Sequence, residues 1–415
     1  MARSIEERAP KRRWGQYLAV GSLATVSMTG HVIYPLVLGV VTRKYPPHQI
    51  PPIVTWPSVS VLIPAYLEQQ VIEAKVADVR KQAYPGALEI IVVADDVDTY
   101  TAARRTGVTV LHNRSRQGKS AAVNAGVAAA RHQVVVLTDA NALLQPAALT
   151  QLVRHFVDPT VGAVAGAKQV LDSTGQGFYW KFESWLKSRE SRLGTTMGMV
   201  GELAAFRRDL FRPLPQPLIA DDLWLNLDII ESGFRVLFEP TALAVELGSP
   251  GIAVEWERRT RIITGTLDVL WRRPNMLLPG TSPVAGQLWG HKLVRSTIGP
   301  LAHVALLGYL AGHRAGHRGS RSGRLARLTI VGHVVGLAGV AHMARGGELP
   351  RLLQLPAQVL FLQAVALAGL ARFLKGDRRS IWPKTERALT PDMEWLMPKQ
   401  GRHVETGRLR SLPVE

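Results

Sequence analysis

The stretch VVVLTDANALLQP, from Val134 to Pro146, begins as a short apolar strand and runs directly into polar residues. Five apolar or β-branched residues precede Asp139, and Ala140 and Asn141 then turn the chain. Asp and Asn favour turns through hydrogen bonds of their own side chains, so a surface turn is one interpretation. A divalent cation with a phosphate on its far side is the other, because such cations take oxygen ligands.

Apolar runs of this kind recur between Trp56 and Pro279, with helical segments between them. This alternation predicts an α/β domain whose mostly parallel strands are covered on both faces. In such sheets ligands bind beyond the carboxyl ends of the strands, which is where Asp95, Asp96 and Asp139 fall. The predicted strands are VSVLIPAY (59–66), LEIIVVADD (88–96), VTVLHN (108–113) and QVVVLTDAN (133–141), and GKSAAVNAGVAAAR (118–131) is a predicted helix.

The composition combines a net charge of +18 with a slightly positive mean hydropathy of +0.06 over 415 residues. Basic residues that flank apolar runs beside anionic lipid would reconcile the two values. The sequence has no basic helix, zinc-ligand spacing or aromatic–basic ribonucleoprotein motif, so we expect no nucleic-acid partner. It has no cysteine, which excludes disulfides, thiolate metal sites and a cysteine nucleophile.

Four apolar segments are candidate membrane helices, since about 20 residues suffice to span a bilayer. They cover residues 16–41, 293–310, 325–344 and 352–374. The second overlaps HKLVR and contains Pro300, so we expect it to lie partly in the membrane interface. The predicted organisation is a basic N-terminal segment with a transmembrane helix (1–45), a central domain (56–280), interfacial and transmembrane helices (281–375) and a C-terminal tail (376–415).

Nine motifs follow one another along the central domain, and WPKTER (382–387) follows in the tail. The nine are VSVLIPAYLEQ, EIIVVADD, GKSAAVNAG, VLTDAN, VGAVAG, GELAAFRR, IADDLWLNL, GFRVLFEPTALAVE and ERRTRIITG. Their order resembles that of membrane-associated family 2 glycosyltransferases, to which cellulose, chitin and hyaluronan synthases are related. The resemblance implies a GT-A fold, an inverting mechanism, and a multi-pass protein of the cell (inner or plasma) membrane with a cytoplasmic catalytic domain.

In that family the loop after the first strand packs on the nucleotide base, and a carboxylate after the second strand binds the base. Leu67 stands where the family usually has Asn, and DDVD stands where it has Asp-Gly-Ser-Thr-Asp. The choice between Asp95, Asp96 and Asp98 therefore stays open, and a solvated acidic turn is the alternative. The residues implied for nucleotide binding are Pro64, Ala65, Tyr66, Glu68 and Asp95 or Asp96.

Two further motifs are implied to hold the donor diphosphate. Lys119 follows Gly118 at the predicted start of a helix, where its charge and the free backbone donors suit a phosphate. The alternative is a surface lysine. TDAN stands in place of the family's DxD motif, so Asp139 and Asn141 are implied ligands of Mg²⁺ or Mn²⁺. Asn141 offers only a neutral oxygen, which lowers the charge of the metal site.

The acidic pair in IADDLWLNL is implied to supply the catalytic base, with Asp222 in that role and Asp221 beside it. A neighbouring like charge raises the pKa of such a pair, which suits a base. The alternative is that the acids stabilise the first turn of a helix. On the acceptor side we expect Gly201 and Glu202, together with Trp224 as a platform for a sugar or else as a core residue.

ERRTRIITG aligns with the QxxRW segment of processive synthases. Arg258 replaces the Gln, Arg261 keeps the Arg, and Ile262 replaces the Trp. Arg261 can neutralise the charge that develops on the diphosphate. In polymerising relatives this Trp would form the floor of the acceptor site. Its absence here weakens the expectation of a long processive product. The alternative is a basic helix in the membrane interface.

We therefore expect a membrane-bound transferase that moves a sugar from a UDP-sugar to a hydroxyl of a glycan or lipid acceptor. Its expected partners are the donor, the acceptor and membrane lipids, and the sequence leaves open a partner subunit. The alternative is a catalytically idle membrane protein that binds a nucleotide sugar or a partner synthase. Retention of Asp139, Asp222, Lys119 and Arg261 together favours the enzyme.

Overall fold

The computed structural model describes residues 9–113, 118–171, 176–249, 251–316, 321–347 and 349–377. Within them, eight strands form one mixed sheet in the order β3-β2-β1-β4-β7-β6-β8-β5. The predicted α/β fold is confirmed, whereas the tail from residue 378 onward, with WPKTER, lies outside the described residues. The strands are β1 (Val59–Ala65), β2 (Leu88–Ala94), β3 (Thr109–His112), β4 (Val134–Leu137), β5 (Leu143–Leu144), β6 (Val161–Leu171), β7 (Ala204–Arg207) and β8 (Arg235–Leu247).

The four predicted strands make the parallel half of the sheet. β1 pairs in parallel with β2 and β4, and β2 pairs in parallel with β3, so their carboxyl ends meet at one edge. Leu62 packs into the core on one face, whereas Val61 and Ile63 pack into the core on the other. The first face is covered by α5 (Lys119–Ala129) and α8 (Asp221–Glu231), and the second by α3 (Ile72–Arg80), α4 (Val97–Arg104) and α6 (Ala148–Val153).

The antiparallel strand β7 brings a distant segment to this edge. Leu137 at the end of β4 pairs with Ala204 at the start of β7. The hydroxyl of Thr138 donates to the carbonyl oxygen of Glu202 over 2.9 Å, which fixes the segment before β7. Gly201 and Glu202 therefore lie beside the end of β4.

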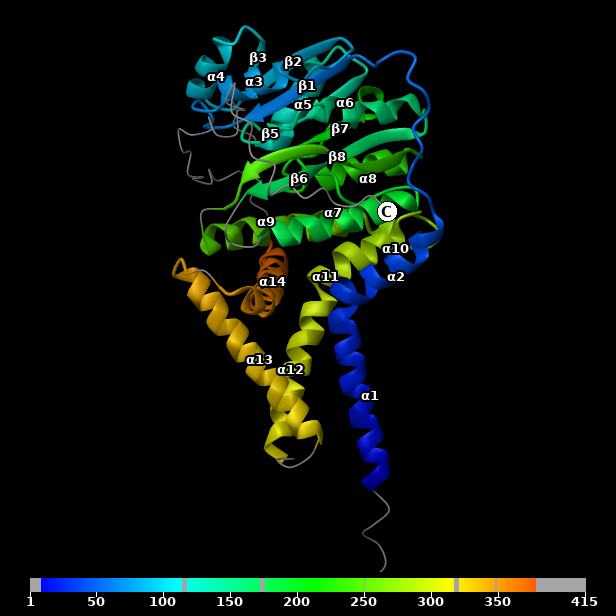
Figure 1. Cartoon of the computed structure of the whole chain (residues 1–415), viewed down its shortest axis with the longest axis vertical. Helices are drawn as coiled ribbons and strands as arrows, with labels where there is room; N and C mark the ends of the chain where they lie inside the picture. Colours follow the sequence, from blue (N-terminus) through cyan, green and yellow to red (C-terminus); the bar gives the residue numbers. More distant parts are fainter. Residues whose placement is uncertain are drawn as a thin grey trace, which may run out of the picture.

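Figure 1 shows α7 (Gln176–Arg192) and α9 (Ile252–Arg272) lying between the sheet and the long helices α1, α12 and α13, which extend away from it. The other helices are α1 (Ala9–Met28), α2 (Tyr34–Val41), α10 (Ala285–Gln287), α11 (Val294–Ser296), α12 (Ile298–Gly316), α13 (Arg321–Ala344) and α14 (Arg351–Leu374). Short π-helical segments are η1 (Thr29–Ile33) and η6 (Leu288–Leu293), and 3₁₀ turns are η2 (Thr42–Lys44), η3 (Arg154–Val157), η4 (Arg208–Leu210) and η5 (Pro274–Leu277).

Three of the described helical segments are long and apolar enough to cross a membrane, namely Leu18–Lys44, Arg327–Ala344 and Pro356–Leu374. They coincide with the first, third and fourth predicted segments. The second falls in two helices, Ala285–Ser296 and Ile298–Gly312, that are bent by 44° as in a broken span or a re-entrant loop. Many large apolar side chains on these helices are exposed, as expected of surfaces that face lipid.

Helix α9 is fixed to the candidate span in α14 by close packing. A Cβ added at Gly369 would lie 2.6 Å from Cγ2 of Ile263, so only glycine allows the two helices to approach this closely. The hydroxyl of Thr264 donates to the carbonyl oxygen of Gly369 over 3.2 Å. Arg372 and Glu257 form an ion pair at 2.6 Å on the same joint. The arginines of α9 are thus carried on a helix that is anchored to α14.

The turn after β4 is supported from below by a buried lysine of α3. Lys75 is fully buried, and its Nζ donates to the carbonyl oxygen of Ala142 and lies 3.3 Å from Oδ2 of Asp78. The same Oδ2 accepts a hydrogen bond from the backbone N–H of Leu144 over 3.0 Å. This network holds both ends of the short segment that follows Asp139.

Replacement of Lys75 by Met should destabilise the domain, because Asp78 would keep a charge without its ammonium partner. Breaking a buried pair from one side costs about 3 kcal/mol. For a domain of this size that corresponds to a fall in Tm of roughly 6–12 °C. Thermal unfolding in detergent, followed by tryptophan fluorescence, measures the change, with Lys181→Met as the control because Lys181 is exposed. Equal Tm values for Lys75→Met and the unmodified protein would contradict this account of the turn.

Candidate active site

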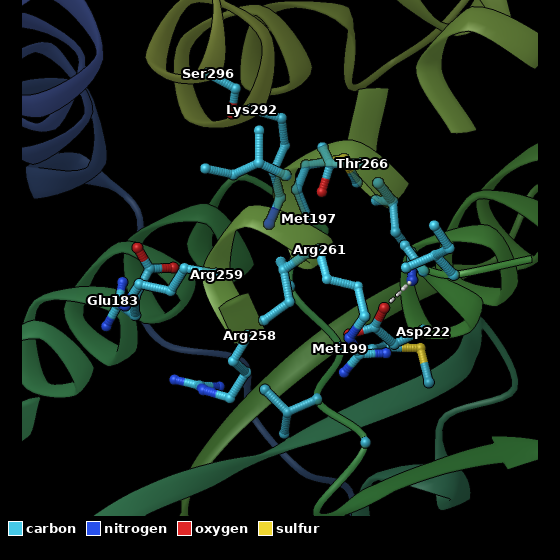
Figure 2. Close-up of a pocket in the computed structure, with 18 of the residues that line it drawn as sticks. Glu183, Met197, Met199, Asp222, Arg258, Arg259, Arg261, Thr266, Lys292 and Ser296 are labelled. Carbon is cyan, nitrogen blue, oxygen red and sulfur yellow. Dashed lines mark hydrogen bonds between the residues drawn. The ribbon is translucent and has the colours of Figure 1, made fainter. Parts of the chain in front are cut away.

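A cavity of about 280 Å³ lies between the sheet edge, α7, α9 and the candidate membrane helices. Figure 2 shows Asp222 on one side of it, the arginines of α9 on another, and Lys292 and Ser296 of the bent helix pair on a third. The structure brings eight of the predicted site residues to its lining, from motifs far apart in the sequence. They are Lys119, Asp139, Gly201, Glu202, Asp221, Asp222, Arg258 and Arg261.

Lys119 and Asp139 form an ion pair at the sheet edge, with 2.7 Å between Nζ and Oδ1. Gly118 begins α5 with a φ of +87°, a conformation that favours glycine. Burial disfavours the ammonium group of Lys119, but Asp139 and Asp221 outweigh burial and raise its pKa. A Cβ added at Gly201 would lie 2.5 Å from Nζ of Lys119, so Gly201 leaves room for the ion pair.

Two polar residues of α5 hold the loop that leads to Asp221. The Asn124 side chain donates to the carbonyl oxygen of Leu214 over 3.0 Å and accepts from the N–H of Leu214 over 2.8 Å. Ser120 donates to the carbonyl oxygen of Leu218 over 3.3 Å. The motif GKSAAVNAG therefore links the Asp139 edge to the start of α8, and the polar residues within the helix are explained by these contacts.

Asp221 and Asp222 open α8 and face the cavity. Burial and the adjacent Asp221 raise the pKa of Asp222 to about 6, although the N–H of Leu223 donates to its Oδ1 over 2.8 Å. A carboxyl group with such a pKa is ionised above about pH 6 and can accept a proton there. The geometry thus provides a carboxylate suited to be a base.

The arginines of α9 differ in their partners. Glu255 accepts two hydrogen bonds of 2.9 Å from Arg258 and also pairs with Arg259. Arg261 has no hydrogen bond or ion pair among the described residues, although it lines the cavity with Asp221 and Asp222. Burial lowers its pKa, but a guanidinium group stays charged near neutral pH. Arg261 is therefore available to an anion in the cavity.

Glu202 is held from the side that faces away from the cavity centre. Lys168 pairs with both Glu202 and Glu246, and it lies 4.5 Å from the ring centroid of Trp180. Although burial opposes ionisation, Lys168 keeps the pKa of Glu202 well below its usual range. Glu202 therefore lines the cavity as an ionised carboxylate, and the ammonium group of Lys168 compensates its charge.

The residues predicted to bind the nucleotide lie at the same sheet edge but do not line the cavity. Pro64 and Ala65 end β1, and Tyr66 and Glu68 follow it, beside Asp95 and Asp96 after β2. Asp95 accepts a hydrogen bond of 2.8 Å from the side chain of Asn113. Asp98 is exposed in the first turn of α4.

Asp96 has a local structural role. Its carboxylate accepts from the backbone N–H of Leu67 over 2.6 Å and from that of Thr99 over 2.9 Å, which caps α4 and shapes the first loop. Leu67 has a φ of +54°, a left-handed conformation that Asn adopts more readily than Leu. The local backbone thus gives a physical reason for Asn at this position in the family.

Two other predicted residues also lie outside the cavity lining. Asn141 is half-buried in the turn after β4. The guanidinium carbon of Arg273 lies 3.9 Å from the ring centroid of Trp224, and this ring packs against the hydrophobic core. Trp224 therefore does not present its ring to the cavity in this structure.

Sequence reasoning missed a second group of lining residues, which comes from α7 and the candidate membrane helices. Glu183 of α7 binds Arg295 at 2.6 Å and His291 at 3.1 Å. Seven residues later on the same helix, Glu190 lies 2.7 Å from His291 and accepts from the hydroxyl of Tyr34 over 2.7 Å. The seven-residue spacing of the two acids on one helix was the available signal, since it places both on one face. The missed lining residues with polar side chains include His31, Tyr179, Glu183, Lys187, His291, Lys292 and Arg295.

A divalent metal would find few protein ligands here. No group of three or more His, Asp or Glu residues placed to hold a metal exists in the described parts of the chain. Asp139 and Asn141 offer one charged and one neutral oxygen, and diphosphate oxygens and water would complete the shell. Hard oxygen donors of this kind fit Mg²⁺ or Mn²⁺.

Three similarities to known proteins bear on this site. The sequence model of the family described as "Glycosyl transferase family 2" matches residues 60–214. A mannosyltransferase of Pyrobaculum calidifontis, solved in complex with GDP-Man and Mn²⁺, superposes with a TM-score of 0.70 at 25% identity, over 86% of this chain and 99% of that one. An N-acetylglucosaminyltransferase of Rhizobium sp. (strain N33) is 25% identical over 330 residues, which cover 64% of this chain and 71% of the relative.

A poly-beta-1,6-N-acetyl-D-glucosamine synthase of Staphylococcus aureus (strain COL) is also similar. It is 22% identical over 230 residues, which cover 52% of this chain and 56% of the synthase. The chain is thus similar to enzymes whose names contain different sugars. Similarity to this family therefore does not identify the donor sugar.

The carboxyl group of Asp222 should titrate near pH 6, protonated below that pH and ionised above it. Asp221→Asn removes the neighbouring charge and should move the midpoint toward the ordinary value of about 3.9. Difference infrared spectroscopy of the protonated carboxyl band checks both values, and the band is assigned by its loss in Asp222→Asn. An unchanged midpoint in Asp221→Asn would contradict the coupling of the pair.

Proposed function

The chain contains a glycosyl transferase family 2 domain, as its motifs predicted, and we propose that it is a membrane-bound, inverting, metal-dependent enzyme. In this proposal it transfers a sugar from a UDP-sugar to a hydroxyl group of a glycan or lipid acceptor, in the synthesis of a cell-surface polysaccharide or glycolipid. The observation that carries the proposal is the cavity. It joins Lys119, Asp139, Asp222 and Arg261 from four separate motifs.

The donor would lie along the sheet edge, with its base in the loop of Pro64, Ala65, Tyr66 and Glu68. Asp95 is the better candidate for binding the base, because two backbone N–H groups already occupy the carboxylate of Asp96. Asp139 and Asn141 would hold Mg²⁺ or Mn²⁺, which when bound supplies positive charge to the diphosphate. The Mn²⁺ in the mannosyltransferase complex supports a divalent metal.

The transfer itself would be a single displacement. Asp222 takes the proton of the acceptor hydroxyl, and the hydroxyl oxygen bonds to the anomeric carbon of the donor sugar. The bond from that carbon to the diphosphate breaks, and the nucleoside diphosphate leaves with the electron pair. Lys119 and Arg261 stabilise the negative charge of the leaving group. Attack from the side opposite the leaving group inverts the anomeric configuration.

The catalytic domain, residues 56–280, would face the cytoplasm, where nucleotide sugars are made. The exposed apolar side chains of the candidate spans support insertion in the cell membrane, for example Leu36, Leu328 and Leu337 at 61–70% exposure. Ile262 stands where processive relatives have Trp and is 43% exposed. Without an aromatic ring at this position of the acceptor site, the addition of one or a few sugars is favoured over the synthesis of a long polymer.

Asp222→Asn should abolish transfer and leave donor binding near normal, because the amide cannot take the acceptor proton. We expect a loss of about 10²–10⁴-fold in transfer rate. Incorporation of a labelled UDP-sugar by the full chain in lipid nanodiscs measures the rate, and calorimetric titration with UDP measures binding. Full transfer by this variant would remove Asp222 from the role of base.

Transfer by the unmodified enzyme should rise with pH through a midpoint near 6 and level off above about pH 7, since only ionised Asp222 acts as the base. The raised pKa means that the active form is lost as the pH falls through 6. A profile of the transfer rate between pH 4.5 and 8 tests this. A rate that is flat across pH 6 would contradict the proposed base.

Asp139→Ala should weaken metal-dependent binding of UDP by about tenfold or more, since the metal loses its only charged protein ligand in the proposed set. Asp209→Ala is the matched control, because Asp209 is an exposed acid in η4. Titration of UDP with and without Mn²⁺ gives the comparison. Equal metal-dependent binding by Asp139→Ala and the unmodified protein would refute the cation site.

A further inference from the structure

The cavity contains more positive charge than the donor site uses. Seven Lys and Arg side chains line it, and four of them are paired with acids: Lys119 with Asp139, Arg258 and Arg259 with Glu255, and Arg295 with Glu183. The other three, Arg261, Lys187 and Lys292, have no ion pair or hydrogen bond with any residue that the structure describes. Arg261 is assigned to the donor diphosphate, so two lysines are left.

Lys187 is the more unusual of the two, because only 4% of it is exposed. Its ammonium nitrogen lies 5.6 Å from the ring centroid of Phe238, and a Cβ added at Gly198 would lie 2.5 Å from its Cε. Glu183, one turn earlier on α7, is already bound by Arg295 and His291. Burial lowers the pKa of Lys187 to about 8, so the side chain still carries charge near neutral pH. A buried ammonium group without an acidic partner is costly unless a ligand supplies the anion.

Lys292 brings the second charge from another element of the chain. It belongs to η6, in the bent pair of helices, and is half-buried at the cavity. Lys187 and Lys292 both interact electrostatically with Asp222 across the cavity. Both lysines therefore lie within electrostatic range of the proposed base, so an acceptor that they bind can also reach Asp222.

Part of the cavity wall is apolar, and candidate membrane helices contribute to the lining. Leu362, Val365 and Ala366 come from the span in α14, and His31 comes from the first span. Ser296 ends the first helix of the bent pair. A lipid chain along this wall would contact helices whose length and composition suit a membrane. The cavity lining thus combines cationic groups with apolar side chains.

We propose that Lys187 and Lys292 bind the phosphate of a lipid acceptor, so that a hydroxyl on the same headgroup reaches Asp222. The proposal rests on the proposed function and names the acceptor class for that site. The phosphate does not react. It anchors the acceptor, while the donor diphosphate uses Lys119, Arg261 and the metal. The donor diphosphate and the acceptor phosphate, bound at different places in the cavity, thus account for all three cations that have no ion pair or hydrogen bond with a described residue.

A phosphate-bearing lipid explains the apolar wall, whereas a soluble phosphate does not need it. A lipid with a hydroxyl but no phosphate would fit the wall and leave the two lysines without an anion. Phosphatidylglycerol carries a phosphate and free hydroxyls on one headgroup and is therefore the probe. Diacylglycerol serves as the lipid without phosphate, and glycerol 3-phosphate as the soluble phosphate.

The experiment measures lipid retained by the full chain. Protein is taken from nanodiscs of phosphatidylcholine with added phosphatidylglycerol or diacylglycerol, and bound lipid is counted by native mass spectrometry. Lys187→Met and Lys292→Met are compared with Lys181→Met, a lysine exposed on the same helix as Lys187. Met keeps most of the length of the side chain and removes the charge. The half-buried Lys292 gives a second variant whose folding does not depend on a fully buried site.

We expect preferential retention of phosphatidylglycerol, reduced about tenfold or more in either cavity variant, as for loss of one charge-assisted hydrogen bond, and unchanged in Lys181→Met. Any of three results would overturn the proposal. Lys292→Met could retain as much phosphatidylglycerol as the unmodified protein does, or diacylglycerol could be retained as well as phosphatidylglycerol. In the third result, glycerol 3-phosphate displaces the lipid at concentrations similar to those of the lipid. UDP titration with Mn²⁺ on the same samples distinguishes a failure of the proposed transferase function from a failure of the proposed acceptor site. Loss of UDP binding in every sample would count against the transferase, whereas normal UDP binding without lipid selectivity would count against the acceptor site alone.

Discussion

The ion pair between Lys119 and Asp139 is the contact around which the cavity is arranged. It joins the end of β4 to the start of α5, the helix that directly precedes this strand in the chain. Antiparallel β7 returns Gly201 to this pair, and the absence of a Cβ there leaves room for Nζ of Lys119. Lys75 supports the same turn from inside the domain. The carboxylate that we propose as a cation ligand is thus held by a lysine, next to a turn that Lys75 supports.

A second constraint couples this edge to the candidate membrane helices. The acids of α7, Glu183 and Glu190, bind His291, Arg295 and Tyr34, and α9 is fixed to α14 through Gly369. Because these joints are buried and polar, the helices have a defined place relative to the sheet. The cavity is therefore lined partly by candidate membrane helices, which is the physical basis of the proposed lipid acceptor.

Much of the fold was predictable because it depends on local pattern. The apolar runs of β1, β2 and β4 and the helix after Gly118 follow from hydrophobic runs and turn residues. The motifs also indicated which acids and arginines meet at one edge. The sequence could not show that Asp96 is occupied by backbone N–H groups, or that Arg273 covers the ring of Trp224. Nor could it show that Lys75 and Lys187, each on a helix, are buried. These facts depend on contacts between residues far apart in the chain, which spacing along one helix or strand does not reveal.

The central claim is that one cavity brings a nucleotide sugar together with a lipid-borne hydroxyl. The most direct test is incorporation of label from a panel of UDP- and GDP-sugars by the full chain in nanodiscs, with Mg²⁺ or Mn²⁺ and with chelator as the control. The product is divided into lipid-extractable and high-molecular-mass fractions. The account predicts metal-dependent label from a UDP-sugar in the lipid-extractable fraction. Absence of both transfer and hydrolysis with every donor would contradict it and favour a protein that only binds a nucleotide sugar or a partner synthase.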